Sequence, residues 1–144
     1  MTFNAMDLDQ ASLLKRAKAE AALIYNKSST RKDRSLEEIT ATVLYGHAAE
    51  QYLIESRNFK DDPRAYKDVI DPHGNPVEVK VTESDDYVKY VLKRANEAAS
   101  ESWRKYPKWL YVFIGERNNL NYHLNGIYLW NGKEFCLHST TFVV

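Results

Sequence analysis

The sequence predicts one domain of the mixed α/β class, in which helices pack on a sheet that combines parallel and antiparallel strands. Segments with apolar residues every three or four positions alternate with short β-rich runs, in the order helix, helix, strand, strand, helix, strand and terminal hairpin. The 144 residues suffice for one domain with a core and are too few for two, and no repeat or low-complexity segment is present. We therefore treat residues 1–144 as a single domain.

Two helices are predicted before the first strand. Residues Leu8 to Tyr25 have apolar side chains at helical spacing, with Asp7 or Asp9 available as the cap. A second helix begins at Ser35, because Glu38 follows this serine at the spacing of a capping box. The expected buried stripe of the second helix contains two ionisable residues; its members are Leu36, Ile39, Val43, His47, Glu50 and Ile54.

The middle of the chain predicts two short strands and a third helix. The strands cover Tyr66 to Ile70 and Val77 to Thr82. The helix runs from about Asp85 to Arg104, with Ser84 as its cap.

The C-terminal third predicts the centre of the sheet and its last hairpin. Trp109 to Ile114 is short, apolar and aromatic throughout, which is typical of a central strand covered on both faces. Two β-rich runs joined by Asn131-Gly132 predict a hairpin. Cys136 lies in its second strand, where we expect it in the core.

Composition limits the classes of function. The chain has 20 Lys and Arg against 20 Asp and Glu, so its net charge is about zero and it does not attract nucleic acid or membrane as a whole. Any anionic partner must therefore bind at a local cluster of basic residues. A single cysteine excludes an intramolecular disulfide framework, and no apolar run is long enough to span a membrane. The N-terminal residues lack the pattern of a signal peptide. We expect a soluble protein in the reducing cytoplasm.

The segment between the first two strands predicts the register of a β-hairpin. Residues Asp71 to Gly74 have Asp, Pro and Gly at the positions that favour a type I turn followed by a left-handed glycine. That loop geometry sets which residues of the two strands face each other. The expected pairs are Ile70 with Pro76, Val69 with Val77, Asp68 with Glu78, and Tyr66 with Lys80.

The predicted register places two carboxylates directly opposite each other. Side chains opposed in this way are about 5 Å apart, where like charges are destabilising. A divalent cation between Asp68 and Glu78 would convert this repulsion into coordination. Alternation puts Lys80 on the same face as Glu78 and sends Asp71 to the other face, so Asp68 is the better ligand. A second interpretation stays open, because a half-exposed strand with alternating Val and charged residues is common.

Asp68, the Glu78-Val79-Lys80 triplet and a preceding helix that carries Glu50 together resemble the PD-(D/E)XK nuclease superfamily. The resemblance covers about residues 36–114 and implies a restriction-endonuclease-like core of helix, strand, strand, helix and strand. The N-terminal helix and C-terminal hairpin would be additions to it. Lys67 stands where the motif has proline. The superfamily also has a strand before the one with Asp68, for which only residues 56–64 are available, so this strand must be very short or displaced.

The resemblance implies a Mg²⁺-dependent DNA endonuclease, with Mn²⁺ as a substitute cation. Asp68, Glu78 and the backbone carbonyl of Val79 would be metal ligands, and Lys80 would activate the attacking water. Glu50 would complete the ligand set or hold a water on the metal. The sequence leaves open whether His47, one turn before Glu50, is a further ligand, a proton carrier or a core residue. The other histidines, His73, His123 and His138, lack metal-ligand spacing.

Contacts with DNA phosphates are expected from two groups of cations. The predicted loop at residues 26–35 and its flank carry Lys27, Arg31, Lys32 and Arg34, and the polar side of the third helix carries Lys89, Lys93 and Arg94. A homo-oligomer is expected, since cutting both strands requires two sites. Two other interpretations remain: a catalytically inactive nuclease-fold module that binds nucleic acid or protein, and a structural α+β protein with a charged hairpin, in which Glu50 is buried by pairing with a lysine or arginine.

Overall fold

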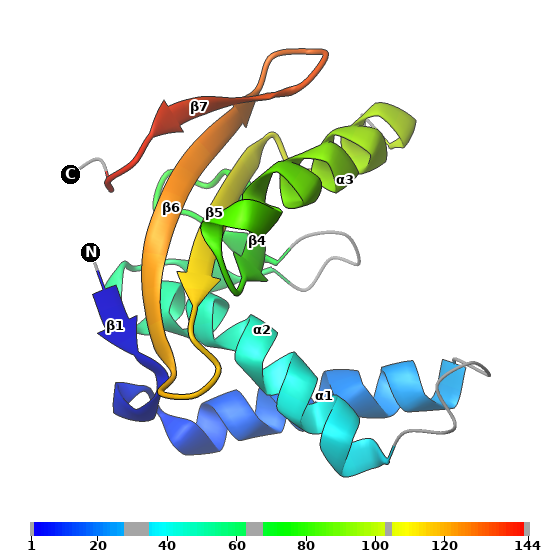
Figure 1. Cartoon of the computed structure of the whole chain (residues 1–144), viewed down its shortest axis with the longest axis vertical. Helices are drawn as coiled ribbons and strands as arrows, with labels where there is room; N and C mark the ends of the chain where they lie inside the picture. The colour runs from blue at the N-terminus through cyan, green and yellow to red at the C-terminus, as the bar shows by residue number, and fades with distance from the viewer. Residues whose placement is uncertain (1, 28–34, 63–67, 103–104, 143–144) are drawn as a thin grey trace.

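The computed structural model describes residues 2–27, 35–62, 68–102 and 105–142. They form a mixed α/β fold in which one curled sheet separates two layers of helices (Figure 1). The helices are α1 (Gln10–Lys27), α2 (Leu36–Ser56) and α3 (Val88–Glu101), with short 3-10 helices η1 (Ala5–Asp7) and η3 (Asp85–Tyr87). The strands are β1 (Thr2–Asn4), β2 (Lys60–Asp61), β3 (Val69–Ile70), β4 (Pro76–Thr82), β5 (Trp109–Gly115), β6 (Asn121–Trp130) and β7 (Phe135–Ser139).

The sheet has the strand order β1-β6-β5-β4-β3-β2, and β7 pairs with β6 beside β1. The β4–β5 pair is parallel and the other pairs are antiparallel. Parallel neighbours need a crossover, and α3 supplies it. The predicted central strand is confirmed, because β5 lies between β4 and β6 and its residues alternate between two cores.

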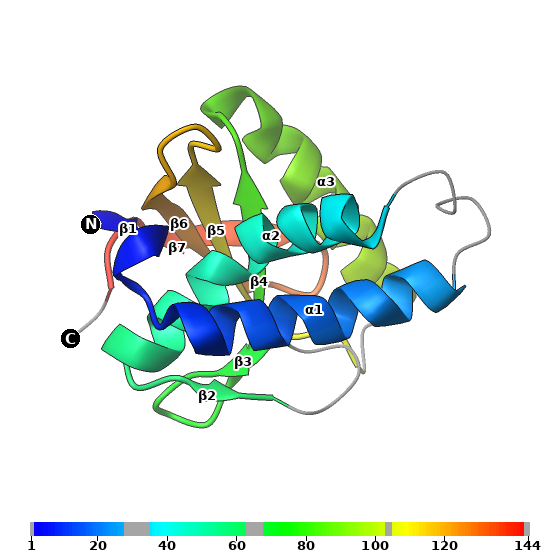
Figure 2. The same ribbon diagram turned by 90° about the horizontal axis from the view of Figure 1, so that it is seen from below.

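One core lies between the sheet and the α1–α2 pair, whose arrangement is clear from below in Figure 2. It contains Leu13, Leu53, Val77, Val79 and Phe113. The second core lies on the opposite face under α3 and contains Ala95, Ala99, Leu110, Val112 and Phe135. Val77 and Val79 belong to the first core and Val81 packs against it, which confirms that the valines of β4 face the α1–α2 pair. The alternate residues of β4, Glu78 and Lys80, point to the other face of the strand.

Several expected elements differ in detail. Asp9 caps α1 by accepting a hydrogen bond from the Ser12 backbone N–H at 3.2 Å. The third helix begins with the 3-10 turn η3, and Ser84 makes no side-chain cap hydrogen bond, so the prediction of a Ser84 cap is wrong. Strand β1 and the β5–β6 hairpin were not predicted. The prediction that Cys136 is a core residue is also wrong, because Cys136 is exposed on β7.

A very short strand, β2, precedes Asp68. β2 has two residues and pairs antiparallel with β3 through Lys60 opposite Ile70 and Asp61 opposite Val69. In the part of the chain that the structure describes, no helix is long and apolar enough to cross a membrane.

Candidate active site

The β3–β4 hairpin has the predicted turn, and the two predicted pairs nearest to it are confirmed. Asp68 contacts Glu78 through its side chain but lies outside the paired residues of β3, and Tyr66, expected opposite Lys80, lies outside the described residues. Gly74 has a φ of +86°, and its N–H donates to the Asp71 carbonyl at 2.9 Å. Val69 faces Val77, and Ile70 faces Pro76. The Asp71 carboxylate stays in the turn, where it accepts hydrogen bonds from the backbone N–H groups of residues 73 and 75. The inference that Asp71 is outside the site agrees with this role.

Asp68 lies one residue beyond the last hairpin pair, at the point where the edge of β4 opens. Among the described residues, β4 pairs only with β5 from Glu78 onward. The Asp68 carboxylate accepts a hydrogen bond from the Val79 N–H at 2.8 Å and so satisfies a donor on this edge. The side chain is thereby held next to the Glu78-Val79-Lys80 triplet.

Glu78 and Lys80 share one face of β4, as alternation predicts. The Lys80 ammonium lies 3.4 Å from Glu78 Oε1. The lysine side chain is 44% exposed and the glutamate side chain 11%. Lys80 therefore reaches solvent, while the carboxyl group of Glu78 is largely buried.

The α2 helix brings Glu50 to the same place, together with His47 one turn earlier. His47 Nδ1 lies 2.5 Å from Glu50 Oε2, although the two groups are not aligned as a hydrogen bond and Nδ1 has no hydrogen-bond partner among the described residues. The other ring nitrogen, Nε2, contacts the Glu20 carboxylate of α1. His47 thus connects carboxylates from two helices.

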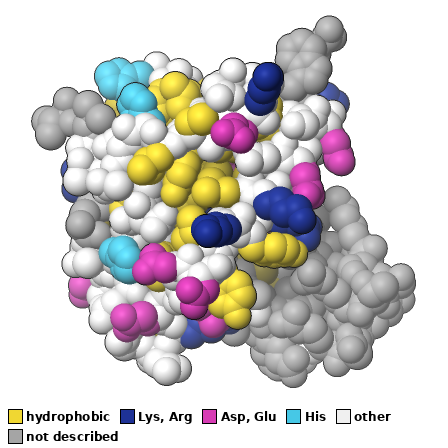
Figure 3. Space-filling view, turned by 45° about the horizontal axis from the view of Figure 1, so that its top comes forward, with side chains coloured by type: hydrophobic (Ala, Val, Ile, Leu, Met, Phe, Trp, Pro, Cys, Tyr) yellow, Lys and Arg dark blue, Asp and Glu magenta, His cyan; other side chains and the backbone are white. Residues whose placement is uncertain are grey.

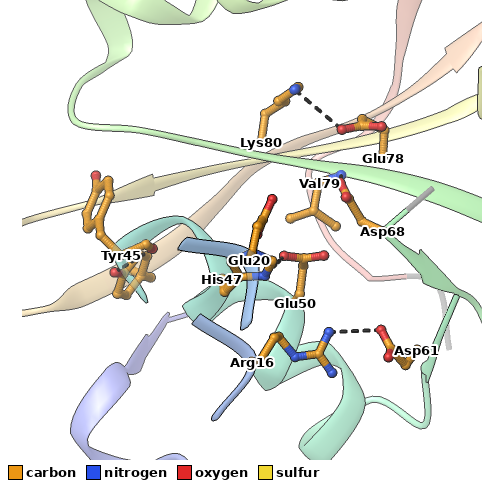
Figure 4. A network of polar contacts seen from close by, with 11 residues as sticks. Arg16, Glu20, Tyr45, His47, Glu50, Asp61, Asp68, Glu78, Val79 and Lys80 are labelled. Carbon is orange, nitrogen blue, oxygen red and sulfur yellow. Dashed lines mark hydrogen bonds and ion pairs between the residues drawn. The ribbon is translucent and has the colours of Figure 1, made fainter. Parts of the chain in front are cut away.

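These side chains line one pocket of ≈ 300 Å³ at the open edge of β4. Figure 4 shows them on both sides of this strand, with Lys80 and Glu78 on one side and Glu50, His47 and Glu20 on the other. We call it the acidic pocket. Among the described residues that line it, four are acids and one is a lysine; the lining comprises Glu20, Val43, Gly46, His47, Glu50, Asp68, Glu78, Val79 and Lys80. All of the predicted catalytic residues therefore lie together. Glu20 was not predicted, since only the packing of α1 on α2 brings it near.

Burial and mutual repulsion oppose ionisation of two of the carboxyl groups. Burial, the charge of Asp68 and a hydrogen bond with Asp68 raise the pKa of Glu78 to about 9, although Lys80 acts in the other direction. Burial also raises the pKa of Glu50, and the charge of Asp68 contributes, against the lowering effect of His47. Burial lowers the pKa of His47, but the contact with Glu50 and the charge of Glu20 outweigh this effect and raise it.

The acidic pocket supplies carboxylate oxygens, which are the ligand type that Mg²⁺ and Mn²⁺ prefer. Burial and the charge of Asp68 raise the pKa of Glu78, so without a cation a proton on Glu78 removes the repulsion between the two carboxylates. A divalent cation between them would remove the same repulsion. Within residues 2–27, 35–62, 68–102 and 105–142, the side chains as placed form no group of three or more His, Cys, Asp or Glu that could hold a metal ion. Asp68 and Glu78 are in contact with each other, and Glu50 contacts His47.

The cations expected to contact DNA are described only in part. The side chain of Lys27 and the residues Arg31, Lys32 and Arg34 lie outside what the structure describes. On α3, Lys89, Lys93 and Arg94 are exposed, as predicted. Residues 85–101 carry four acids against three bases, so this segment is not basic as a whole. Figure 3 shows charges of both signs interspersed around a central hydrophobic band.

The other histidines are separate from the acidic pocket. His73, His123 and His138 are all exposed. His138 packs edge-on against the Trp109 ring, with centroids 5.0 Å apart. These positions agree with the expectation that none of the three belongs to the predicted site.

The sequence was compared with models of protein families and with curated proteins, and the structure with solved structures; none of the three comparisons found a match.

Proposed function

We propose that this protein is a Mg²⁺-dependent DNA endonuclease that hydrolyses phosphodiester bonds in the acidic pocket. The observation that carries the proposal is the convergence of Asp68, Glu78, Glu50 and Lys80 on one pocket from three separate elements. Burying several carboxyl groups side by side lowers the stability of the fold. Groups whose pKa is shifted in this way, here Glu50 and Glu78, cluster at functional sites in proteins.

The arrangement of elements supports a restriction-endonuclease-like core of the PD-(D/E)XK type. Helix α2 precedes the antiparallel strands β2, β3 and β4, and α3 then crosses over to β5, which is parallel to β4. The proposal takes Asp68 and Glu78, which are in contact beside this hairpin, as the acidic residues of the motif. The proposal assigns α1, β1 and the β6–β7 hairpin as additions to this core.

Mg²⁺ is the cofactor that the proposal requires, and Mn²⁺ would substitute for it. Asp68, Glu78 and Glu50 would hold the cation, and the proposal keeps the Val79 carbonyl as a further ligand. When bound, the cation would neutralise charge on the scissile phosphate and promote ionisation of the attacking water.

The chain's own groups have distinct tasks in this scheme. The Val79 N–H fixes the orientation of the Asp68 carboxylate. Lys80 is exposed enough to contact the phosphate and to stabilise the charge that develops on it. His47, in contact with both Glu50 and Glu20, holds the Glu50 side chain toward the pocket. The site would therefore be preorganised from both helices and the hairpin.

We further propose that the enzyme acts in the cytoplasm as a homo-oligomer. One acidic pocket cuts one strand, so cleavage of a duplex at one position requires a second pocket.

A cleavage assay tests the proposal. Purified protein is incubated with supercoiled, linear, branched and single-stranded DNA in Mg²⁺, in Mn²⁺ and in EDTA. We expect cleavage that requires a cation, is lost in Asp68→Asn and Glu78→Gln, and is slowed about 100-fold in Lys80→Ala. Glu97→Gln, an exposed acid on α3, is the matched control and should retain full activity.

Two results would contradict the proposal. Cleavage that continues in EDTA would exclude the cation, and full activity of Glu78→Gln would place the chemistry elsewhere. If no substrate is cleaved and calorimetry detects no Mn²⁺ binding at millimolar concentration, the inactive binding module becomes the better interpretation.

A further inference from the structure

A second pocket lies at the turn end of the β3–β4 hairpin and plays no part in the proposed chemistry. Its volume of ≈ 400 Å³ is within the range of small-molecule sites. The hairpin turn, the C-terminal end of α2, the start of β5 and the segment after β7 contribute to it. We call it the turn pocket.

The walls of the turn pocket are largely aromatic. Phe59, Trp109, Tyr111 and Phe142 line it. The rings of Phe59 and Tyr111 meet edge-on at 5.7 Å between centroids, and those of Tyr111 and Phe142 are tilted at 5.9 Å. These rings come from α2's end, β5 and the C-terminal segment, so they converge only in the folded chain. Such walls favour a planar aromatic ligand, because ring stacking adds to simple burial.

The polar groups of the turn pocket favour a ligand that is also anionic. The Arg57 guanidinium lies 4.5 Å from the centroid of the Phe142 ring. Two imidazoles, His73 from the turn and His138 from β7, also line the pocket. Asp71 also lines the pocket, and burial together with its negative charge raises the pKa of Tyr111; its carboxylate oxygens accept hydrogen bonds within the turn, which hold this group at the turn side of the pocket.

One lining residue offers hydrogen bonds to the edge of an aromatic base. Asn58 has a side-chain amide with both a donor and an acceptor, the combination that matches base edges. Its φ of 60° has a structural cause, because it lies at the C-terminal end of α2, where the Phe59 N–H bonds to the Leu53 carbonyl.

We propose that the turn pocket binds a nucleotide, with the base among the aromatic rings and the phosphate near Arg57 and the imidazoles. The source of that nucleotide is either free nucleoside monophosphate or a residue of a nucleic-acid strand. Asn75, at the turn pocket, precedes Glu78 of the acidic pocket by three residues, or about 10 Å of extended strand. The proposal does not depend on cleavage and is testable without a cation.

Calorimetric titration in EDTA tests the proposal with dAMP, deoxyadenosine, inorganic phosphate and a dA₅ oligonucleotide as probes. We expect saturable binding of dAMP, weaker binding of deoxyadenosine and the weakest binding of phosphate. Similar affinity for dAMP and dA₅ would assign the pocket to the free nucleotide, and much tighter binding of dA₅ would assign it to a strand. In NMR spectra of the wild type, the Trp109 indole N–H signal should shift on binding.

Variants locate the binding site. Phe142→Ala should weaken dAMP binding at least about fivefold, the smallest effect of losing one base–aromatic stack. Arg57→Gln should weaken dAMP but not deoxyadenosine. Leu137→Ala, an exposed neighbour on β7 outside the pocket, should bind as the wild type does.

The proposal is wrong if the wild type binds neither dAMP nor dA₅ at millimolar concentration. It is also wrong if binding leaves the Trp109 signal unmoved, a measurement that does not depend on a variant folding. Loss of cleavage in the Glu78→Gln variant would leave these titrations unchanged, so the two proposals fail separately.

Discussion

Replacing Glu78 by glutamine should make the cation-free protein more stable at neutral pH while removing its activity. The side chain is buried beside Asp68, and its pKa of about 9 means that folding requires it to hold a proton at pH 7. Glutamine is neutral at every pH, has nearly the same shape and can donate an N–H to the Asp68 carboxylate as protonated Glu78 does. The substitution therefore keeps the contact and removes the cost of the charge.

The size of the effect follows from the pKa difference between the folded and unfolded chain. Because the folded pKa of Glu78 is raised from 4.5 to about 9, its stabilising contribution is complete below pH 4.5 and is lost as the pH rises through this window. At about 1.4 kcal/mol per pH unit, the wild type loses about 3 kcal/mol between pH 4.5 and pH 7 through this group. Glu78→Gln avoids that loss and should melt roughly 10 °C higher at pH 7.

Urea and thermal denaturation in EDTA, from pH 5 to pH 9, measure this effect. The difference between Glu78→Gln and the wild type should be small at pH 5 and grow with pH. Glu97→Gln, with its exposed side chain, controls for the loss of a carboxylate and should follow the wild type. A Glu78→Gln protein that is less stable than the wild type at pH 8, or a difference that does not depend on pH, would refute the reasoning.

Three further substitutions test separate parts of the structure. Lys80→Ala should lower the cleavage rate about 100-fold in the supercoiled-DNA assay but leave Mn²⁺ affinity in calorimetry unchanged or higher, because it removes a positive charge from the site; weaker Mn²⁺ binding would contradict this. Gly74→Ala should cost about 1–2 kcal/mol in urea denaturation, since its φ of +86° is strained for alanine; an unchanged midpoint would disprove the turn geometry. Gly115→Ala should cost about 1–3 kcal/mol, because the new Cβ would lie 2.4 Å from the ring of buried Tyr122; wild-type stability would show that this ring can move.

The hairpin register was predictable because its determinants are local. Asp71, Pro72 and Gly74 fix the turn within four residues, and the turn then fixes the pairs at Val69 and Ile70. The parity of the strand follows, so the separation of Asp68 from Asp71 and the common face of Glu78 and Lys80 needed no tertiary information. Glu50 could be placed on the buried side of α2 for a similar reason, because the three- and four-residue spacing of the apolar positions in a helix is also local.

The features that were missed depend on contacts between distant segments. Glu20 reaches His47 only through the packing of α1 on α2, which no local spacing encodes. The β5–β6 connection contains Leu120 with a φ of 58°, a conformation that its sequence does not signal. Strand β1 has three residues and exists only because β6 offers it an edge. Cys136 is exposed although it lies in a β-rich run, and among the described residues the core under the α1–α2 pair includes no residue of β7.

The central claim is that Asp68, Glu78 and Glu50 bind a single divalent cation. The most direct measurement is anomalous X-ray diffraction from crystals of the full chain grown or soaked with Mn²⁺. The claim predicts an anomalous peak in the acidic pocket, within coordination distance of the Asp68 and Glu78 carboxylates and absent from Glu78→Gln crystals. A peak elsewhere, or an acidic pocket without one at saturating Mn²⁺, would contradict it.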